Sequence, residues 1–245
     1  MSKLRVLVTV LSSIERTGWV NPFLAQNLIT MSHDMRYHVA VEMVVDKFPV
    51  DYARNVCISM ARERKSEFLL MIDCDQSFES NPLDILSDGL EKDIISLPCM
   101  QGYSPSAEHP FIPNFRVLDH PEVDGAFCTV KKAGTGSMFI SHRVWEGMRG
   151  PWFRWTYLES SELHESVPNA GEDFDFCERA RSAGFKVWVH SRAISHWKTS
   201  EVTRLGMYTK ASQDIARIAG QAGIAMPNAV NWIVREKVAA EGAGR

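Results

Sequence analysis

Apolar positions along the first hundred residues alternate between two spacings, which predicts strands separated by helices. Residues 4–13 (LRVLVTVLSS) and 68–73 (FLLMID) are mostly apolar, which is typical of strands buried inside a parallel sheet. Residues 37–46 (YHVAVEMVVD) alternate and predict another strand, whereas 21–32 and 50–67 have apolar residues at helical spacing. This β-α-β-α-β order predicts an α/β domain with a mainly parallel central sheet flanked by helices.

The second half of the chain predicts further elements of the same sheet. Helices are expected at 81–92 and 172–184, the second ended by Gly184, and strands at 93–100 and 185–190. The other expectations are two strand pieces around a Gly-rich turn at 126–141, a short helix at 142–148, and irregular stretches at 101–115 and 151–171. Residues 1–202 are therefore expected to form one domain, with 203–245 as a helical C-terminal extension packed on it.

Composition agrees with an ordinary globular protein, since 45% of the 245 residues are hydrophobic and 23% are charged. No apolar run approaches the roughly 20 residues that a membrane-spanning helix needs. The basic and apolar N-terminus lacks the small-residue cleavage site of a signal peptide. The five cysteines are scattered without a CxxC pair, which argues against a disulfide framework and a zinc finger. These features predict a cytoplasmic protein with reduced thiols.

Charge is unevenly distributed along the chain, although the net charge is only −3. Residues 178–245 contain 11 Lys and Arg against 5 Asp and Glu, whereas residues 1–177 contain 16 against 25. A basic C-terminal third suits an anionic partner such as a diphosphate, a nucleic acid or a membrane. A solvated surface rich in Lys and Arg explains the same numbers equally well.

Two aspartates follow the strand predicted at 68–73. Because successive strand side chains alternate between faces, Asp73 and Asp75 should point the same way and Cys74 the other. Ligands of open α/β sheets bind at the carboxyl ends of strands, and two close carboxylates favour a divalent cation between them. Hard oxygen ligands suit Mg²⁺ or Mn²⁺. The alternative is a loop in which one aspartate caps the next element and the other is solvated.

Three other segments offer residues that match such a site. Gly134 and Gly136 allow the backbone to approach a ligand closely. Glu172 and Asp173 fall in the first turn of a predicted helix, where the helix dipole favours acids and where a carboxylate is also well held as a general base. His196 follows a strand and would add one nitrogen to hard acids, which fits Mn²⁺ better than Ca²⁺.

The order of these segments resembles that of the GT-A glycosyltransferases. The similarity is greatest to the family-2-like enzymes and to the small bacterial and phage proteins related to them. It covers roughly residues 4–198. A D-x-D triplet is common, whereas a GED helix followed by a strand and a histidine is more specific. The segments that carry the resemblance are ARN (53–55), LLMIDCD (69–75), AGTGSMFI (133–140), GEDFDFCERARSAGFKVW (171–188) and ISH (194–196).

The resemblance implies a Rossmann-like GT-A fold and a role for each matched residue. Asp73 would contact the donor ribose or the metal shell, and Asp75 would bind Mn²⁺ or Mg²⁺ directly together with His196. Asp173, with Glu172 as the weaker alternative, would activate the acceptor hydroxyl. The residues that would line the donor pocket are Thr9, Ser12, Arg54, Asn55, Asp73, Gly134 and Gly136.

The implied reaction is transfer of a sugar from a nucleoside diphosphate sugar, with a UDP-sugar favoured, to a hydroxyl acceptor. Inversion at the anomeric carbon is favoured over retention. On the acceptor side we expect Trp152, Trp155 and Tyr157, although aromatic residues are as often simply packed in a core. Some phage relatives glycosylate hydroxymethylated pyrimidines in DNA, so DNA is one acceptor to consider. Lipid-linked and polysaccharide acceptors stay open.

Two other classes of protein fit parts of the same pattern. A nucleotidyltransferase also uses paired acids and Mg²⁺, but it should have a basic Gly-rich loop after its first strand. Residues 9–18 (TVLSSIERTG) match such a loop poorly. A non-catalytic protein that binds sugar nucleotides would keep the fold without the reaction, and the presence of both acids and the histidine argues against it.

Overall fold

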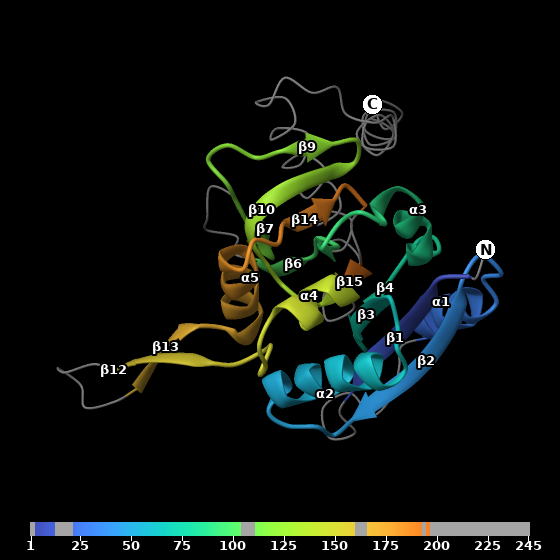
Figure 1. The fold of residues 1–245 in the computed structure, drawn as a ribbon, viewed down its shortest axis with the longest axis horizontal. Helices are drawn as coiled ribbons and strands as arrows, with labels where there is room; N and C mark the ends of the chain where they lie inside the picture. Colours follow the sequence, from blue (N-terminus) through green and yellow to red (C-terminus); the bar gives the residue numbers. More distant parts are fainter. Residues whose placement is uncertain (1–2, 13–21, 104–110, 160–165, 193–194, 197–245) are drawn as a thin grey trace, which may run out of the picture.

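A nine-stranded mixed sheet forms the centre of the protein in a computed structural model that describes residues 3–12, 22–103, 111–159, 166–192 and 195–196 (Figure 1). The strands lie in the order β2-β1-β3-β11-β5-β14-β10-β8, and β9 pairs with β10. In chain order they are β1 (Arg5–Ser12), β2 (His38–Val45), β3 (Phe68–Asp73), β5 (Ile94–Ser96), β8 (Phe115–Val117), β9 (Val123–Asp124), β10 (Phe127–Ala133), β11 (Ser137–Ser141) and β14 (Val187–His190). The predicted α/β class is confirmed.

The sheet is mixed, so the prediction of a mainly parallel sheet is wrong. Among the strands of the described residues, only the pairs β1–β2, β1–β3 and β5–β14 are parallel. β11 lies between β3 and β5 and runs antiparallel to both, with Ser137 opposite Ile72 and Met138 opposite Ser96. Because β11 is reversed, it begins at the edge where β3 ends. The Gly-rich turn before β11 therefore lies at the carboxyl edge of the parallel strands.

Helices cover both faces of the sheet (Figure 1). One apolar cluster joins α2 (Val50–Glu63), α4 (His142–Gly147) and α5 (Glu172–Ser182) to one face. The other joins α1 (Pro22–Ser32), η1 (Pro82–Ile85) and α3 (Leu86–Gly89) to the opposite face. Side chains of β3 alternate between the two clusters, with Leu69 and Met71 toward α2 and Leu70 and Ile72 away from it. The same alternation directs Asp73 toward the α2 side.

The first turn of α5 is rich in acids, as the sequence predicted. Gly171 is the N-cap and provides no side-chain hydrogen bond, while Glu172, Asp173 and Asp175 lie in the first turn, where the helix dipole favours negative charge. The helix ends just before Gly184, whose φ of +94° is in the left-handed region that glycine adopts easily. The predicted C-terminus at this glycine is confirmed.

The part of the chain that the structure describes also forms three smaller two-stranded sheets outside the central one. They are β6 (Met100–Tyr103) with β7 (Phe111–Pro113), β12 (Thr156–Glu159) with β13 (Ser166–Ala170), and β4 (Gln76–Ser77) with β15 (Ser195–His196). The first two correct the expectation that 101–115 and 151–171 are irregular, and the β12–β13 hairpin extends away from the body (Figure 1).

The helix expected at 81–92 is shorter than predicted, because η1 and α3 together end at Gly89. The expected helical extension at 203–245 lies outside the described residues. Within the described part of the chain, no helix has the length and apolar character to cross a membrane.

Candidate functional site

The acids after β3 lie beside the Gly-rich turn that leads into β11. The backbone N–H of Asp73 donates to the carbonyl of Gly136 over 2.8 Å. A Cβ at Gly136 would lie 3.1 Å from Nε2 of Gln76 and 3.6 Å from Oδ2 of Asp73, so the missing side chain lets the turn come close to the acids. Cys74 is buried in the apolar cluster on the opposite face, as strand alternation predicts.

Arg54 on α2 connects this edge of the sheet to α5. Its Nη1 lies 3.5 Å from Oδ1 of Asp73 and donates to the carbonyl of Thr135 over 3.3 Å, while its Nε donates to Oε1 of Glu172 over 3.2 Å. The side chain is only 6% exposed. Burial lowers the pKa of Arg54, but the carboxylates of Asp73, Glu172 and Asp173 outweigh burial and raise it. One buried guanidinium thus joins three segments that are far apart in the sequence.

Asp173 and Glu172 lie side by side at the start of α5 but differ in their surroundings, because Glu172 is paired with Arg54. Burial raises the pKa of the Asp173 carboxyl, and repulsion by Glu172 raises it further, against the opposing effects of Arg54 and of the N–H of Phe174. That N–H donates to Oδ1 of Asp173 over 2.8 Å and orients the carboxylate. A raised pKa brings a carboxylate closer to the range in which it accepts a proton efficiently. Of the two acids, Asp173 is therefore the one whose carboxylate is not paired with Arg54 and whose pKa is raised.

Cys99 is a buried thiol that acids from both β3 and α5 influence. Burial raises the pKa of its thiol to about 12, and the charges of Asp73, Asp75 and Asp173 all add to this rise. Its backbone N–H donates to Oδ1 of the buried Asn114 over 3.0 Å. The sequence analysis missed Asn114, because an asparagine inside a stretch without periodicity gives no signal of its position.

The residues predicted to hold a metal are brought together in part. Asp75 is half-buried one residue before β4, and His196 in β15 lies opposite Gln76 in the β4–β15 pair, so the backbone places it next to Asp75. The side chain of His196 is outside the described part of the structure. Among the described side chains, no three of the types His, Cys, Asp and Glu converge as a metal site. The two carboxylates of Asp73 and Asp75 nevertheless fit Mg²⁺ or Mn²⁺, which often bind through one or two carboxylates and the phosphates of a ligand.

The structure separates the two residues predicted at the end of β1. Thr9 is fully buried, and its Oγ1 donates to the carbonyl of Leu70 over 3.5 Å, inside the sheet. Ser12 ends β1 at the carboxyl edge, and its carbonyl accepts from the N–H of Asp46 over 3.0 Å. Asp46 has a φ of +49°, in the left-handed region that aspartate adopts more readily than most residues with a side chain.

Asn55 supports a loop in this structure. Its Nδ2 donates to the carbonyls of Asp51 and Phe153 over 2.8 and 2.7 Å, and its Oδ1 accepts from the N–H groups of Trp152 and Phe153 over 2.8 and 3.2 Å. These four contacts use all the hydrogen-bonding groups of one amide side chain. In the free protein Asn55 therefore supports residues 152–153.

The three aromatic residues predicted on the acceptor side differ in their placement. Trp152 is buried, and its Nε1 donates to the carbonyl of Trp145 over 3.3 Å, so it belongs to the core rather than to an acceptor surface. Trp155 is 37% exposed, and its ring is 3.9 Å from the position of a Cβ on Gly171, near the start of α5. The side chain of Tyr157 is outside the described part of the structure. Of the two described rings, only that of Trp155 is accessible to an acceptor.

Comparison with known proteins shows distant structural similarity and no match in sequence. No protein-family model matches the sequence, and no curated protein matches it. The chain is similar to A197 from STIV, with a TM-score of 0.48 and 17% identity over 78% of this chain and 84% of that one. It is also similar to a glycosyltransferase involved in the glycosylation of the major capsid of PBCV-1 (TM-score 0.40, 13% identity, 81% and 98% covered).

A nucleotidyltransferase is among the similar structures as well. It is the inositol-1-phosphate CTP transferase from T. maritima, with a TM-score of 0.41 and 11% identity over 91% of this chain and 99% of that one. The chain thus has distant structural similarity to a glycosyltransferase and to a nucleotidyltransferase. Because these similarities are distant, they do not identify the reaction, and the function has to be inferred from the residues of this chain.

Replacing Arg54 with Met should destabilise the fold. The substitution removes the buried cation between Asp73 and Glu172, and loss of one member of a buried ion pair leaves an uncompensated charge. We expect the free energy of unfolding to fall by about 3 kcal/mol in urea titrations at pH 7. The double variant Arg54→Met/Glu172→Gln should recover part of this loss, because the more buried carboxylate is then neutral. A loss below about 1 kcal/mol, the range of surface ion pairs, would contradict a structural role for Arg54.

Proposed function

We propose that this protein is a metal-dependent glycosyltransferase that moves a sugar from a nucleoside diphosphate sugar, with a UDP-sugar as the first choice, to a hydroxyl acceptor. The observation that supports this most is the contact of one buried Arg54 with both Asp73 and Glu172. It brings the acids at the end of β3 close to the carboxylate of Asp173, whose pKa is raised. Transfer from a diphosphate donor needs both features, an acidic site for a cation and a separate base.

Asp173 acts in the proposed reaction on the acceptor hydroxyl. Its carboxylate accepts the proton as the hydroxyl oxygen attacks the anomeric carbon, and the bond between that carbon and the diphosphate oxygen breaks. Attack opposite the leaving group inverts the anomeric configuration. Gly171, where a Cβ would lie 3.0 Å from Oδ1 of Asp173, leaves the space beside this carboxylate open. Trp155 borders the same space and offers an aromatic face to a sugar ring or a base.

The acids at the end of β3 act on the diphosphate side of the donor. A bound divalent cation supplies charge neutralisation for the departing diphosphate. Asp75 and Asp73 would hold Mn²⁺ or Mg²⁺ through carboxylate oxygens, and His196 would add an imidazole nitrogen. The Gly-rich turn at 134–136 would let the donor come close to the backbone, and Ser12, at the end of β1, would line the ribose or base.

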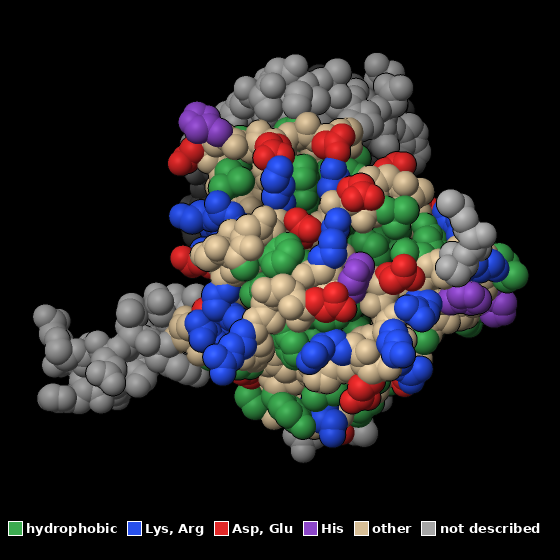
Figure 2. Space-filling view, in the orientation of Figure 1, with side chains coloured by type: hydrophobic (Ala, Val, Ile, Leu, Met, Phe, Trp, Pro, Cys, Tyr) green, Lys and Arg blue, Asp and Glu red, His purple; other side chains and the backbone are tan. Residues whose placement is uncertain are grey.

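The region around α5 carries positive charge that suits an anionic acceptor. Lys132 and Arg116 lie 5.8 and 5.9 Å from the centroid of the Phe174 ring, next to Asp173. The carboxylate of Asp175 pairs with Arg154 and Arg179, and Glu178 pairs with Lys132. Arg116, Lys132, Arg154 and Arg179 thus lie among the carboxylates of this helix, and Figure 2 shows Lys and Arg gathered near the base of the β12–β13 hairpin. These cations suit a phosphate-bearing acceptor, and a hydroxymethylated pyrimidine in DNA is the one we propose.

A panel of nucleotide sugars with Mn²⁺ or Mg²⁺ tests the donor. We expect a UDP-sugar to raise the midpoint temperature of thermal unfolding only when metal is present. We also expect release of diphosphate, measured in the same samples. Asp75→Asn should remove the metal-dependent rise, since it removes a charged ligand. Asp173→Asn should keep that rise and lose release of the diphosphate, because it removes only the base.

Other outcomes of the same panel would contradict the proposal. Release of pyrophosphate from a nucleoside triphosphate and a sugar phosphate would indicate a nucleotidyltransferase. Binding of a sugar nucleotide without release, unchanged in Asp173→Asn, would indicate a binding protein. No response to any nucleotide sugar would remove the assignment altogether.

The pH dependence of kcat/KM should report the environment of Asp173. A general base works in its deprotonated form, so activity should rise as the pH rises through the raised pKa of Asp173. Glu172→Gln removes the repulsion that Glu172 exerts, which lowers the pKa of Asp173 and should move the acid limb of the profile to lower pH. Glu178→Gln, an exposed position on the same helix, is the control and should leave the limb in place. An unchanged limb in Glu172→Gln would argue that another group is the base.

Binding to duplex DNA should weaken steeply as salt concentration rises, because cations that contact phosphates release counterions. Fluorescence anisotropy at several salt concentrations gives the slope. The variant Lys132→Met/Arg154→Met should bind less tightly and show a shallower slope. Absence of binding at low salt, or a flat response, would exclude DNA as the acceptor while leaving the donor chemistry untouched.

A further inference from the structure

The segment that contains His196 is paired with the segment after Asp75 over two residues only. In the β4–β15 pair, His196 lies opposite Gln76 and Ser195 opposite Ser77. Even a complete two-stranded hairpin is only marginally stable in water, and this pair is far shorter than a typical strand. The pairing therefore needs an additional anchor to place His196 reproducibly.

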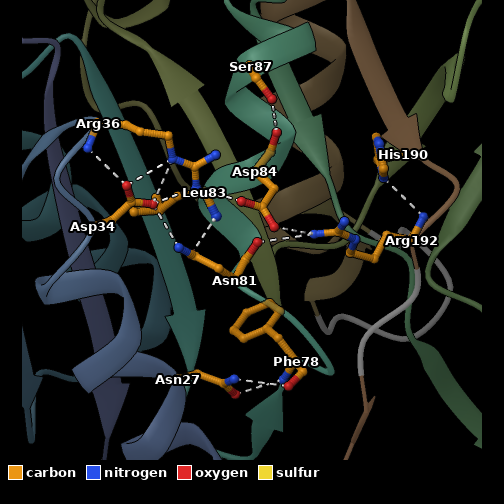
Figure 3. A network of polar contacts seen from close by, with 10 residues as sticks. All are labelled: Asn27, Asp34, Arg36, Phe78, Asn81, Leu83, Asp84, Ser87, His190 and Arg192. Carbon is orange, nitrogen blue, oxygen red and sulfur yellow. Dashed lines mark hydrogen bonds and ion pairs between the residues drawn. The ribbon is translucent and has the colours of Figure 1, made fainter.

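Arg192 provides a contact of this kind four residues before His196. Its Nη1 donates to the carbonyl of Asn81 over 3.1 Å and lies 3.8 Å from Oδ2 of Asp84 (Figure 3). Its backbone N–H donates to Nδ1 of His190 over 3.0 Å. Arg192 thus connects the end of β14 to the segment that continues from β4 into η1.

His190 gives this connection a fixed end in the sheet. Its ring packs edge-on against Phe127, with the ring centroids 4.8 Å apart and the planes at 71°. Burial lowers the pKa of His190 to about 3, and the nearby Arg192 acts in the same direction. The ring is therefore neutral at pH 7, and Nδ1 can accept the N–H of Arg192.

The receiving end is held by a network of polar contacts (Figure 3). Nδ2 of Asn81 donates to Oδ2 of Asp34 over 2.7 Å, and its Oδ1 accepts from the N–H of Leu83 over 3.0 Å. Arg36 pairs with the carboxylates of both Asp34 and Asp84. The carbonyl and the carboxylate that Arg192 reaches are thus fixed from several directions.

The segment just after β4 is also tied to α1. The side chain of Asn27 donates to the carbonyl of Phe78 and accepts from its N–H, both over 2.9 Å. Four residues of extended chain span at most about 14 Å, so an anchored Arg192 limits how far His196 can move from β4.

We propose that Arg192 is a positioning residue for the metal site, holding the segment that ends at His196 so that this histidine stands beside Asp75. The inference rests on the proposed function, since it assumes that Asp75 and His196 bind the same cation. Arg192 is 33% exposed and Asp84 40% exposed, and partners of this exposure stabilise a fold only slightly. Residues that orient metal ligands, in contrast, commonly change metal affinity by 10- to 100-fold. The role therefore predicts an effect on metal affinity without a matching effect on stability.

The test is a titration of Mn²⁺ in the presence of UDP, with free Mn²⁺ followed by electron paramagnetic resonance. Arg192→Met should raise the Kd for Mn²⁺ about tenfold. Its thermal midpoint without metal should stay close to that of the wild type. Arg192→Lys keeps the positive charge near Asp84 but loses the planar guanidinium. Its Kd for Mn²⁺ should therefore lie between those of the wild type and Arg192→Met. In turnover assays, the Mn²⁺ concentration for half-maximal activity should rise in Arg192→Met, while kcat at saturating Mn²⁺ should stay near the wild-type value.

Arg143→Met is the matched control. Arg143 is 39% exposed and pairs with two carboxylates, Glu91 and Asp93, away from the site, so its loss should leave Mn²⁺ binding unchanged. Asp75→Asn should remove Mn²⁺ binding and shows where the metal is held.

Two results would overturn the inference, and they differ from each other. A wild-type Kd in Arg192→Met, with binding lost in Asp75→Asn, would remove the role of Arg192 and keep the proposed function. If the wild-type protein does not bind Mn²⁺ in the presence of UDP, both the role of Arg192 and the proposed function are wrong. If Arg192→Met does not fold, Arg192→Lys decides, and a Kd equal to that of the wild type then counts against the positioning role.

Discussion

The burial of one guanidinium between two acids is the constraint on which the candidate site depends. Arg54 is 6% exposed, and a cation removed from water to this degree is tolerated only with charged and hydrogen-bonded partners. Its partners come from the end of β3, from the turn before β11 and from the first turn of α5. Any fold that satisfies Arg54 must therefore bring these three segments to one edge. The candidate site therefore depends on the need of Arg54 for these partners as well as on the order of strands in the sheet.

The same arrangement agrees with the proposed binding of a cation. The carboxylates of Asp73, Glu172 and Asp173 all act on the guanidinium of Arg54, and Asp73, Asp75 and Asp173 add to the rise that burial causes in the pKa of Cys99. Neighbouring carboxylates repel one another, and a divalent cation would relieve that repulsion when it binds. In the proposed function, this repulsion in the free protein would contribute to the affinity for a metal–diphosphate complex. It also keeps the carboxylate of Asp173 close to the range in which it exchanges protons efficiently.

Much of the outline could be predicted from the sequence, because it depends on local patterns. The buried strands at β1 and β3, the helix that carries Arg54 and the acid-rich start of α5 each have a clear period or cap. The insertion of β11 between β3 and β5 could not be predicted from the sequence, since strand order depends on contacts between distant segments. The burial of Thr9 and Trp152 could not be predicted from the sequence either, because both residue types occur in binding sites as well as in cores. Arg54 was expected near the nucleotide, and only the structure shows that it links the acids to each other.

The two arginines that join distant segments at this edge differ in a way that suits a transferase. Arg54 is deeply buried and connects the acids of β3 to the helix that carries the proposed base, so this half of the site should stay rigid. Arg192 is one-third exposed, and water screens its ion pair with Asp84, so its proposed role in placing His196 adds little to the stability of the fold. Release of the product, often the slow step in such enzymes, would require the diphosphate and its metal to leave. A rigid connection between Arg54 and α5 would keep the proposed base in place during this release.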